Sequence, residues 1–110
     1  MRDSILFTLF LSMLSGCTKT PTASDELKFT FKSEYGSWVI NRDGIEIARG
    51  EVRGTYDQKL PRTPGNYTAY LTSVPPGFSY IYVFDRGQKV TFVERSHSNR
   101  VNLEITYTIQ

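Results

Sequence analysis

The chain holds one cysteine, Cys17, and one histidine, His97, the residue types that most often act as nucleophile and general base. His97 lies in the turn-like stretch Ser96–Asn99. A histidine base needs a partner that orients it, and no carboxylate in the sequence is visibly committed to that role. The sequence also has no G-x-S-x-G, phosphate-loop or H-x-x-x-H pattern. We therefore expect a protein that is not an enzyme and has no catalytic residue.

The acidic residues are spaced too widely to predict a metal site. Calcium needs several oxygen ligands from one loop, and no loop here offers more than one carboxylate. The acids concerned are Asp43, Glu46, Glu51, Asp57, Asp85, Glu94 and Glu104. We expect neither a metal nor a cofactor. The net charge of +2, without a run of Lys or Arg, also argues against a nucleic-acid partner.

The residues before Cys17 have the pattern of a secretory signal. Arg2 and the α-amino group supply positive charge, weakened by Asp3, and Ile5–Leu14 is an apolar run of about ten residues. A membrane-spanning helix needs roughly 20 residues, so this run is too short to span and suits a helical signal peptide. The alternative is that Cys17 is a free thiol in a buried helix, which would be unusual in an exported protein.

The stretch Leu14-Ser15-Gly16-Cys17 resembles the lipobox of bacterial lipoproteins. The resemblance implies that residues 1–16 are removed by signal peptidase II and that Cys17 is acylated and anchored in the membrane. Thr18 follows Cys17, in place of the Asp that favours inner-membrane retention in enterobacterial lipoproteins, which implies the outer membrane. Residues 17–26 are small and polar, and are expected to form a flexible tether.

From Leu27 onward the apolar residues alternate with polar ones, which predicts strands. Turn residues separate the strands about every ten residues, as at Asp43-Gly44 and Pro75-Pro76-Gly77. We expect an all-β domain over residues 27–110, an antiparallel β-sandwich of about seven strands, with a small closed barrel as the main competitor. The expected strands are Leu27–Lys32, Ser37–Ile40, Ile45–Ala48, Asn66–Ser73, Phe78–Phe84, Lys89–Arg95 and Val101–Ile109.

Two segments of this region resemble bacterial immunoglobulin-like and transthyretin-like domains. Asp43–Ile47 followed by Leu60–Thr68, which contains Pro64-Gly65-Asn66-Tyr67, matches the phrasing "dG-x-v … lp-x-x-PG-x-Y-t" of those domains. The resemblance implies that this segment opens a core strand and that the Tyr67 ring packs inside. It implies no catalytic residue.

The row Phe78, Tyr80, Tyr82 and Phe84 places four aromatic rings on one face of one strand. Two alternatives remain: the rings fill the core or are half-buried, which we favour, or Ile81 and Val83 face the core while Tyr80 and Tyr82 form an exposed platform. A second group, Arg42, Arg49, Arg53 and Arg62, is expected to form a solvated face, with a contact patch as the alternative.

These observations favour a membrane-anchored, non-enzymatic lipoprotein that presents its β domain for protein–protein contact in the cell envelope. One alternative is an inhibitor or exclusion lipoprotein, such as a lysozyme inhibitor or a receptor-masking phage or plasmid product, in which the segment Arg53–Gly65 would plug the target. Another alternative is a glycan-binding module that uses Tyr80 and Tyr82. The candidate contact residues are Tyr80, Tyr82, Arg42, Arg53 and Arg62.

Overall fold

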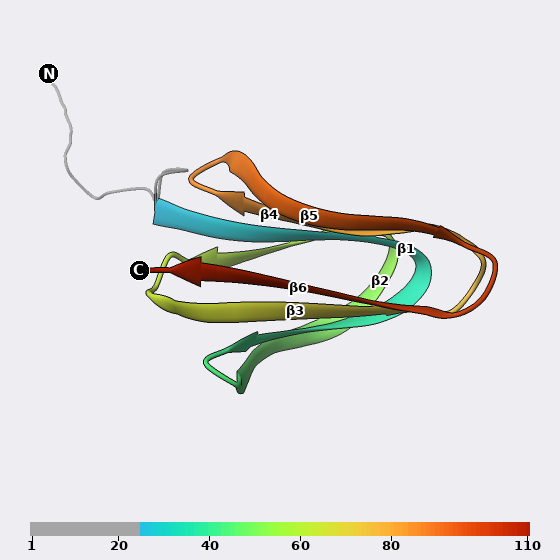
Figure 1. Ribbon diagram of the computed structural model, residues 1–110, viewed down its shortest axis with the longest axis horizontal. Coiled ribbons are helices and arrows are strands. Elements are labelled where there is room, and N and C mark those ends of the chain that lie inside the picture. The colour runs from blue at the N-terminus through green and yellow to red at the C-terminus, as the bar shows by residue number, and fades with distance from the viewer. Residues whose placement is uncertain (1–24) are drawn as a thin grey trace, which may run out of the picture.

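The computed structural model describes residues 25–110, which form a single antiparallel sheet of six strands (Figure 1). The strands are β1 (Glu26–Arg42), β2 (Ile45–Pro61), β3 (Gly65–Ser73), β4 (Gly77–Asp85), β5 (Gln88–His97) and β6 (Val101–Ile109). The all-β, antiparallel prediction is confirmed. The signal peptide and nearly all of the predicted tether lie outside the described residues, and β1 begins at Glu26, one residue before the predicted boundary.

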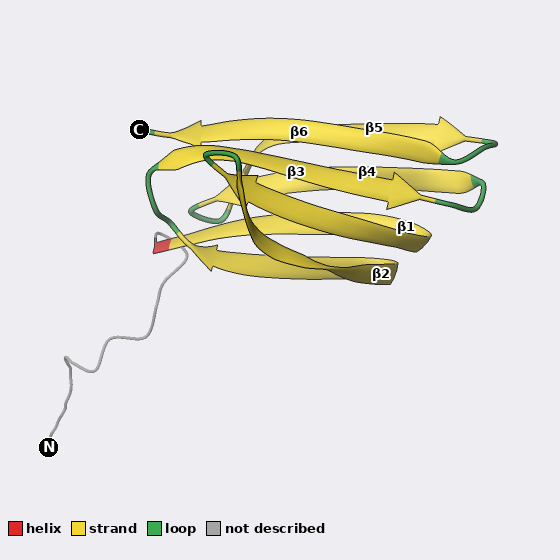
Figure 2. Ribbon diagram, turned by 90° about the horizontal axis from the view of Figure 1, so that it is seen from below, coloured by secondary structure: helices red, strands yellow, loops and turns green. Residues whose placement is uncertain are grey.

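The sheet is folded over on itself because the 17-residue strand β1 bends midway (Figure 2). The first half of β1 pairs with β4, and the second half pairs with β3. We call the resulting layers the β4–β5 arm and the β3–β6 arm. β2 follows β1 through the bend and pairs with both of its halves. The sheet thus runs in the order β5-β4-β1-β3-β6, with β2 on the other side of β1.

The predicted count of seven strands is wrong because the predicted strands Leu27–Lys32 and Ser37–Ile40 are both part of the single strand β1. Ser33–Gly36, which separates two of the predicted strands, is the bend of β1, where a β-bulge shifts the pairing with β2. Backbone packing explains the glycine here, since a Cβ on Gly36 would lie 2.5 Å from the carbonyl oxygen of Thr72. Likewise, β2 does not end at Ala48 but continues to Pro61.

The tight turn predicted at Asp43-Gly44 is present. Asp43 and Gly44, between β1 and β2, have φ angles of 53° and 82°. Positive φ at both central residues is the type I′ geometry that suits the twist of a hairpin. Arg86 and Gly87 repeat this pattern between β4 and β5, with φ angles of 56° and 82°.

The core lies between the two arms and takes apolar side chains from both. The β4–β5 arm contributes Phe29 and Phe31 of β1 with Ile81 and Val83 of β4; the β3–β6 arm contributes Trp38, Ile40, Ala69, Leu71, Leu103 and Ile105. The Phe31 and Trp38 rings stack across the bend with centroids 4.8 Å apart. Alternation of period two along each strand therefore supplies one apolar face to a shared interior.

Tyr67 lies in this core with 1% of its surface exposed, as the resemblance implied. Its hydroxyl donates a hydrogen bond of 2.6 Å to the carbonyl oxygen of Thr63, four residues upstream. A buried tyrosine that bonds back to the preceding corner is a hallmark of immunoglobulin-type domains. The bond fixes the short connection by which the chain passes from β2 to β3.

Candidate functional site

The outer surface of the β4–β5 arm carries a row of aromatic side chains, which we call the aromatic face: Phe78, Tyr80, Tyr82 and Phe84 of β4 and Phe92 of β5. Phe78 and Phe92 are 42% and 50% exposed, and the other three are half-buried. The residues between them in β4, Ile81 and Val83, are fully buried. Strand alternation thus divides β4 between the core and this outer face.

This arrangement decides between the two alternatives for the row. The interpretation that these rings fill the core is wrong, because Ile81 and Val83 occupy the interior. The rings are half-buried by packing against one another on the outside. Phe92 was not singled out in the sequence, although it lies directly opposite Tyr82 in the β4–β5 register. The alternation Val90-Thr91-Phe92-Val93 was the available signal for it.

The rings of the aromatic face hold each other in fixed orientations. Tyr80 and Tyr82 stack with centroids 4.0 Å apart and an interplanar angle of 15°. Phe84 and Phe92 meet the Tyr82 ring edge-on, at 6.4 and 5.8 Å. Offset-stacked and edge-to-face contacts are the favoured geometries of aromatic pairs. The face is therefore organised before any partner binds.

Charged groups border the rings. The ammonium nitrogen of Lys28 lies 4.5 Å from the Phe84 ring centre, and that of Lys89 lies 4.4 Å from the Tyr82 centre. Both distances are within the range of cation–π attraction. The Tyr82 hydroxyl donates a hydrogen bond of 2.6 Å to the carboxylate of Glu94. This bond, aided by desolvation and the carboxylate charge, raises the pKa of Tyr82 to about 12.

The three candidate arginines do not form one patch. Arg42 ends β1, where it lies opposite Ile45 of β2 and Tyr67 of β3. Arg53 lies near the bend, with its guanidinium carbon 4.8 Å from the Tyr35 ring centre. Arg62 follows β2 and is engaged in an ion pair. Arg49 pairs locally with Glu46 at 2.7 Å.

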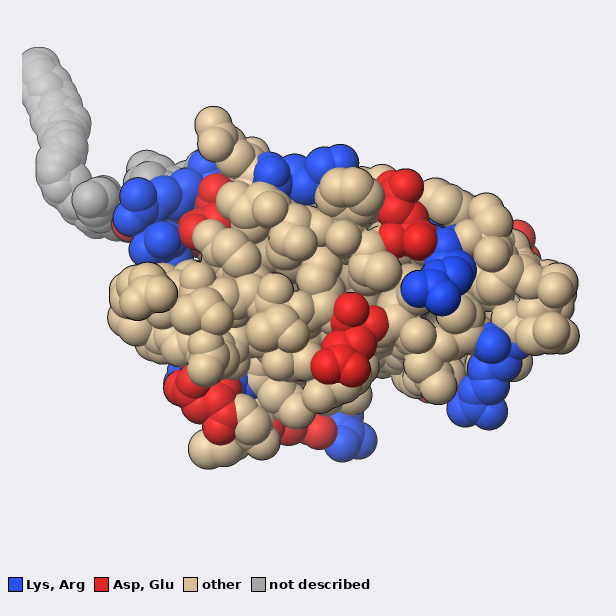
Figure 3. Space-filling model, in the orientation of Figure 1, with Lys and Arg blue, Asp and Glu red and all other residues tan. Residues whose placement is uncertain are grey.

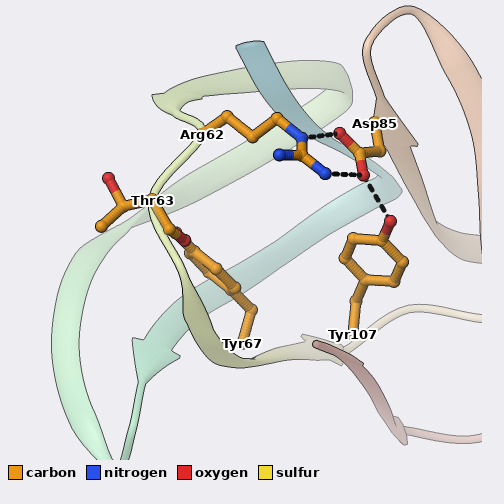
Figure 4. Close-up of polar contacts among 5 residues, drawn as sticks. All are labelled: Arg62, Thr63, Tyr67, Asp85 and Tyr107. Atoms are coloured by element: carbon orange, nitrogen blue, oxygen red, sulfur yellow. Dashed lines mark hydrogen bonds and ion pairs between the residues drawn. The ribbon is translucent and has the colours of Figure 1, made fainter. Parts of the chain in front are cut away.

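Arg62 belongs to a polar cluster that joins the two arms at the end of the sheet where β1 begins (Figure 4). Its Nε lies 2.6 Å from Oδ1 of Asp85, the last residue of β4. The Tyr107 hydroxyl, from β6, donates a hydrogen bond to the other oxygen of the same carboxylate. The Arg62 bond, more than the Tyr107 bond, lowers the pKa of Asp85, whereas the carboxylate raises the pKa of Tyr107. This arginine is a structural residue.

His97 lies at the opposite end of the sheet, beside a chain of buried serines. Its Nε2 is 2.9 Å from the Ser79 hydroxyl oxygen, and Ser79 donates in turn to Ser73, which is bonded to Ser33. The other ring nitrogen of His97 is 2.7 Å from the backbone carbonyl oxygen of Asn99 rather than from a carboxylate. Ser79 is 1% exposed, so a substrate has no access to its hydroxyl in this conformation. The arrangement satisfies buried hydroxyls.

The lipobox residues Leu14, Ser15, Gly16 and Cys17 lie outside the described residues. Within residues 25–110 no helix has the length and apolar character needed to cross a membrane. In the same part of the chain, no three or more His, Cys, Asp or Glu side chains gather where they could hold a metal ion. The aromatic face is accordingly the site with the most developed geometry in the described domain.

Comparison of this chain with protein-family models, with curated proteins and with solved structures found no match.

Proposed function

We propose that this chain is a lipoprotein of the bacterial cell envelope, anchored in the outer membrane through acylated Cys17, that binds an envelope protein through its aromatic face. The observation that carries the proposal is the outward position of the five rings. Contiguous exposed apolar patches rimmed by polar residues are characteristic of interaction surfaces. Tyr and Phe are enriched in the buried centres of protein interfaces.

The contacts within the face favour a protein partner. The rings are already fixed by stacking and edge-to-face packing, so burying them costs little side-chain entropy. The ammonium groups of Lys28 and Lys89 lie over the Phe84 and Tyr82 rings. A protein partner can bury the exposed Phe78 and Phe92 rings and offer acidic groups to these lysines.

A glycan is the weaker candidate because sugar rings stack on exposed aromatic faces. One face of the Tyr82 ring is covered by Tyr80, and Lys89 lies over the Tyr82 ring as well. The inhibitor alternative relied on Arg53–Gly65 as a protruding plug. Residues 54–61 of that segment are paired with β1, which leaves a short connection before β3.

The domain fold that we propose in detail is an immunoglobulin-like or transthyretin-like β-sandwich. Its support is the pair of arms that enclose one core (Figure 2) and the Tyr67–Thr63 bond at the corner before β3. Such domains present loops and strand faces to partners while the interior supplies stability.

The anchor is tested by replacing Cys17 with Ser. We expect the variant to lose labelling by radioactive palmitate and to accumulate as an uncleaved precursor, because both acylation and cleavage by signal peptidase II require the cysteine. The measurement is palmitate incorporation and electrophoretic mobility in cells. Normal processing of the Cys17→Ser variant would refute the lipoprotein assignment.

The contact surface is tested by site-specific photo-crosslinking in intact envelopes. A photoreactive phenylalanine analogue at Phe92 or Phe78 should give one discrete adduct, because these are the two most exposed rings of the face. The matched control is the same analogue at Tyr70, which is 39% exposed on β3 of the other arm. Identical adducts from positions 92 and 70 would show that the aromatic face is not a specific contact surface.

A further inference from the structure

β6 is an edge strand that lacks the usual protection against pairing with another chain. In the described part of the chain it pairs with β3 alone. Its nine residues contain no proline and one charged side chain, Glu104, and its register with β3 runs from Val101 to Ile109 without a bulge. Natural proteins usually guard sheet edges with charges, prolines, bulges or very short strands.

The other free edges carry these protective features. β2 contains six charged residues, ends at Pro61, and has two register irregularities in its pairing with β1. β5 contains Lys89, Glu94 and Arg95 and has a bulge in its pairing with β4. The contrast singles out β6 as the edge on which strand addition is least opposed.

The side of the molecule on which β5 and β6 lie is poor in charge. Figure 3 looks onto this side, since β5 and β6 lie nearest the viewer in Figure 1. Most of its surface is uncharged, with one acidic side chain near the middle and an acidic and a basic group together to its right. Val101 and Tyr107 also lie on the inward side of β6, on the same strand face as the core residues Leu103 and Ile105, and remain only partly buried. An added strand would cover apolar surface that the monomer leaves accessible.

We propose that β6 pairs antiparallel with β6 of a second copy, around a two-fold axis at Ile105. The occupant is another copy because the strand is complementary to itself in this register. Every residue of β6 then lies opposite a residue of the other copy. Val101 lies opposite Ile109, Asn102 lies opposite Thr108, and the pairing continues inward to Ile105 on the axis. The β3–β6 arms of the two copies then form one continuous sheet, and the two-fold axis limits the assembly to a dimer.

Two constraints select this register. A shift by one residue would place inward residues of one copy opposite outward residues of the other, which sheet pairing does not tolerate when one face is buried. An axis at Glu104 would bring two carboxylates directly opposite each other, which is destabilising. An axis at Ile105 places each Glu104 opposite the neutral Thr106 of the other copy. This is the register in which all nine residues pair.

The register can be tested with two substitutions of opposite charge at one exposed position. Thr106→Glu places two like-charged pairs across the axis, and we expect it to weaken the dimer by about two- to thirtyfold, from the usual energy of cross-strand charge pairs. Thr106→Lys places each lysine opposite Glu104 and should leave the dimer as tight or tighter. Both variants keep the outward orientation of residue 106, so each serves as the fold control of the other by circular dichroism.

The measurement is the mass of the full processed protein in detergent over a range of concentrations, by analytical ultracentrifugation. A dimer weakened by Thr106→Glu and retained by Thr106→Lys supports the proposal. A monomer at every concentration overturns it, as does a dimer that both variants weaken equally. A dimer that is insensitive to both variants but is broken by Phe92→Ser would move the interface to the aromatic face and also overturn it. None of these outcomes depends on Cys17 acylation or on the partner of the aromatic face.

Discussion

Asp85 connects three segments of the chain through one carboxylate. Arg62 reaches it from the connection after β2, and Tyr107 reaches it from β6. Because β4 and β6 belong to different arms, this single residue links the two layers directly. In the sequence Asp85 is only one of several separate acids and Arg62 is a candidate contact residue, and nothing there shows that the two meet. The two residues are 23 positions apart in the chain, so no local sequence pattern predicts their contact.

Acid should weaken the fold through this residue. The pKa of Asp85 is lowered in the folded state, so its stabilising contribution is complete above the ordinary aspartate pKa of about 3.9 and is lost as pH falls through the lowered value. We expect Asp85→Asn to lower the urea midpoint at pH 7. The difference from the unsubstituted protein should shrink with acidification below about pH 4.

A matched variant is Tyr107→Phe, which removes one hydrogen bond and leaves the Arg62 ion pair in place. Its effect at pH 7 should be smaller than that of Asp85→Asn, because the Arg62 bond is the larger cause of the lowered pKa. Urea midpoints of the three proteins from pH 2 to pH 8 supply the comparison. An Asp85→Asn deficit that is unchanged from neutral to strongly acidic pH would contradict this account.

At the scale of elements, β4 divides its side chains between the core and the outer face, and the two sets should differ in their effect on stability. Ile81→Ala should lower the free energy of unfolding by about 2–5 kcal/mol, because it leaves a cavity in a packed core. Phe78→Ser, on the exposed end of the same strand, should cost less than about 1 kcal/mol. Equilibrium urea unfolding measures both, and equal losses would contradict the outward placement of the aromatic row.

Most strands could be predicted because their signals are local. Asp43-Gly44 and Arg86-Gly87 set their hairpins through positive φ angles, and the alternation from Val101 to Ile109 marks β6. The bend of β1 could not be predicted, because Ser33–Gly36 has the composition of a loop. That segment remains extended because β2 pairs with it on both sides of the bulge, and such pairing is a non-local property.

The candidate site could also be predicted only as far as its sequence signals are local. The period of two placed Phe78, Tyr80, Tyr82 and Phe84 on one face of a strand. Which of the two faces is buried depends on how the arms close over the core, and the alternation in β4 is apolar on both sides. The cross-strand neighbours Phe92 and Lys89 became part of the site only through the β4–β5 register.

On the scale of the whole molecule, every arm of the fold depends on contacts between distant parts of the chain. β1 meets β3 and β4, and β3 meets β6, after long stretches of intervening sequence. Domains dominated by such non-local pairings fold more slowly than helical domains of similar size. During this slower folding the unpaired strand edges are open to contact with other chains.

The central position of β1 has a mechanical consequence. The described chain begins at the free end of this strand, and its first half is hydrogen-bonded to β2 on one edge and to β4 on the other. If Cys17 is anchored as we propose, a pull from the membrane would act along this strand, so both ladders would bear the load in shear and at the same time. Rows of hydrogen bonds loaded together rupture at higher force than bonds unzipped one by one. Under the proposed anchor, the domain would be tethered by a strand that is hydrogen-bonded on both edges.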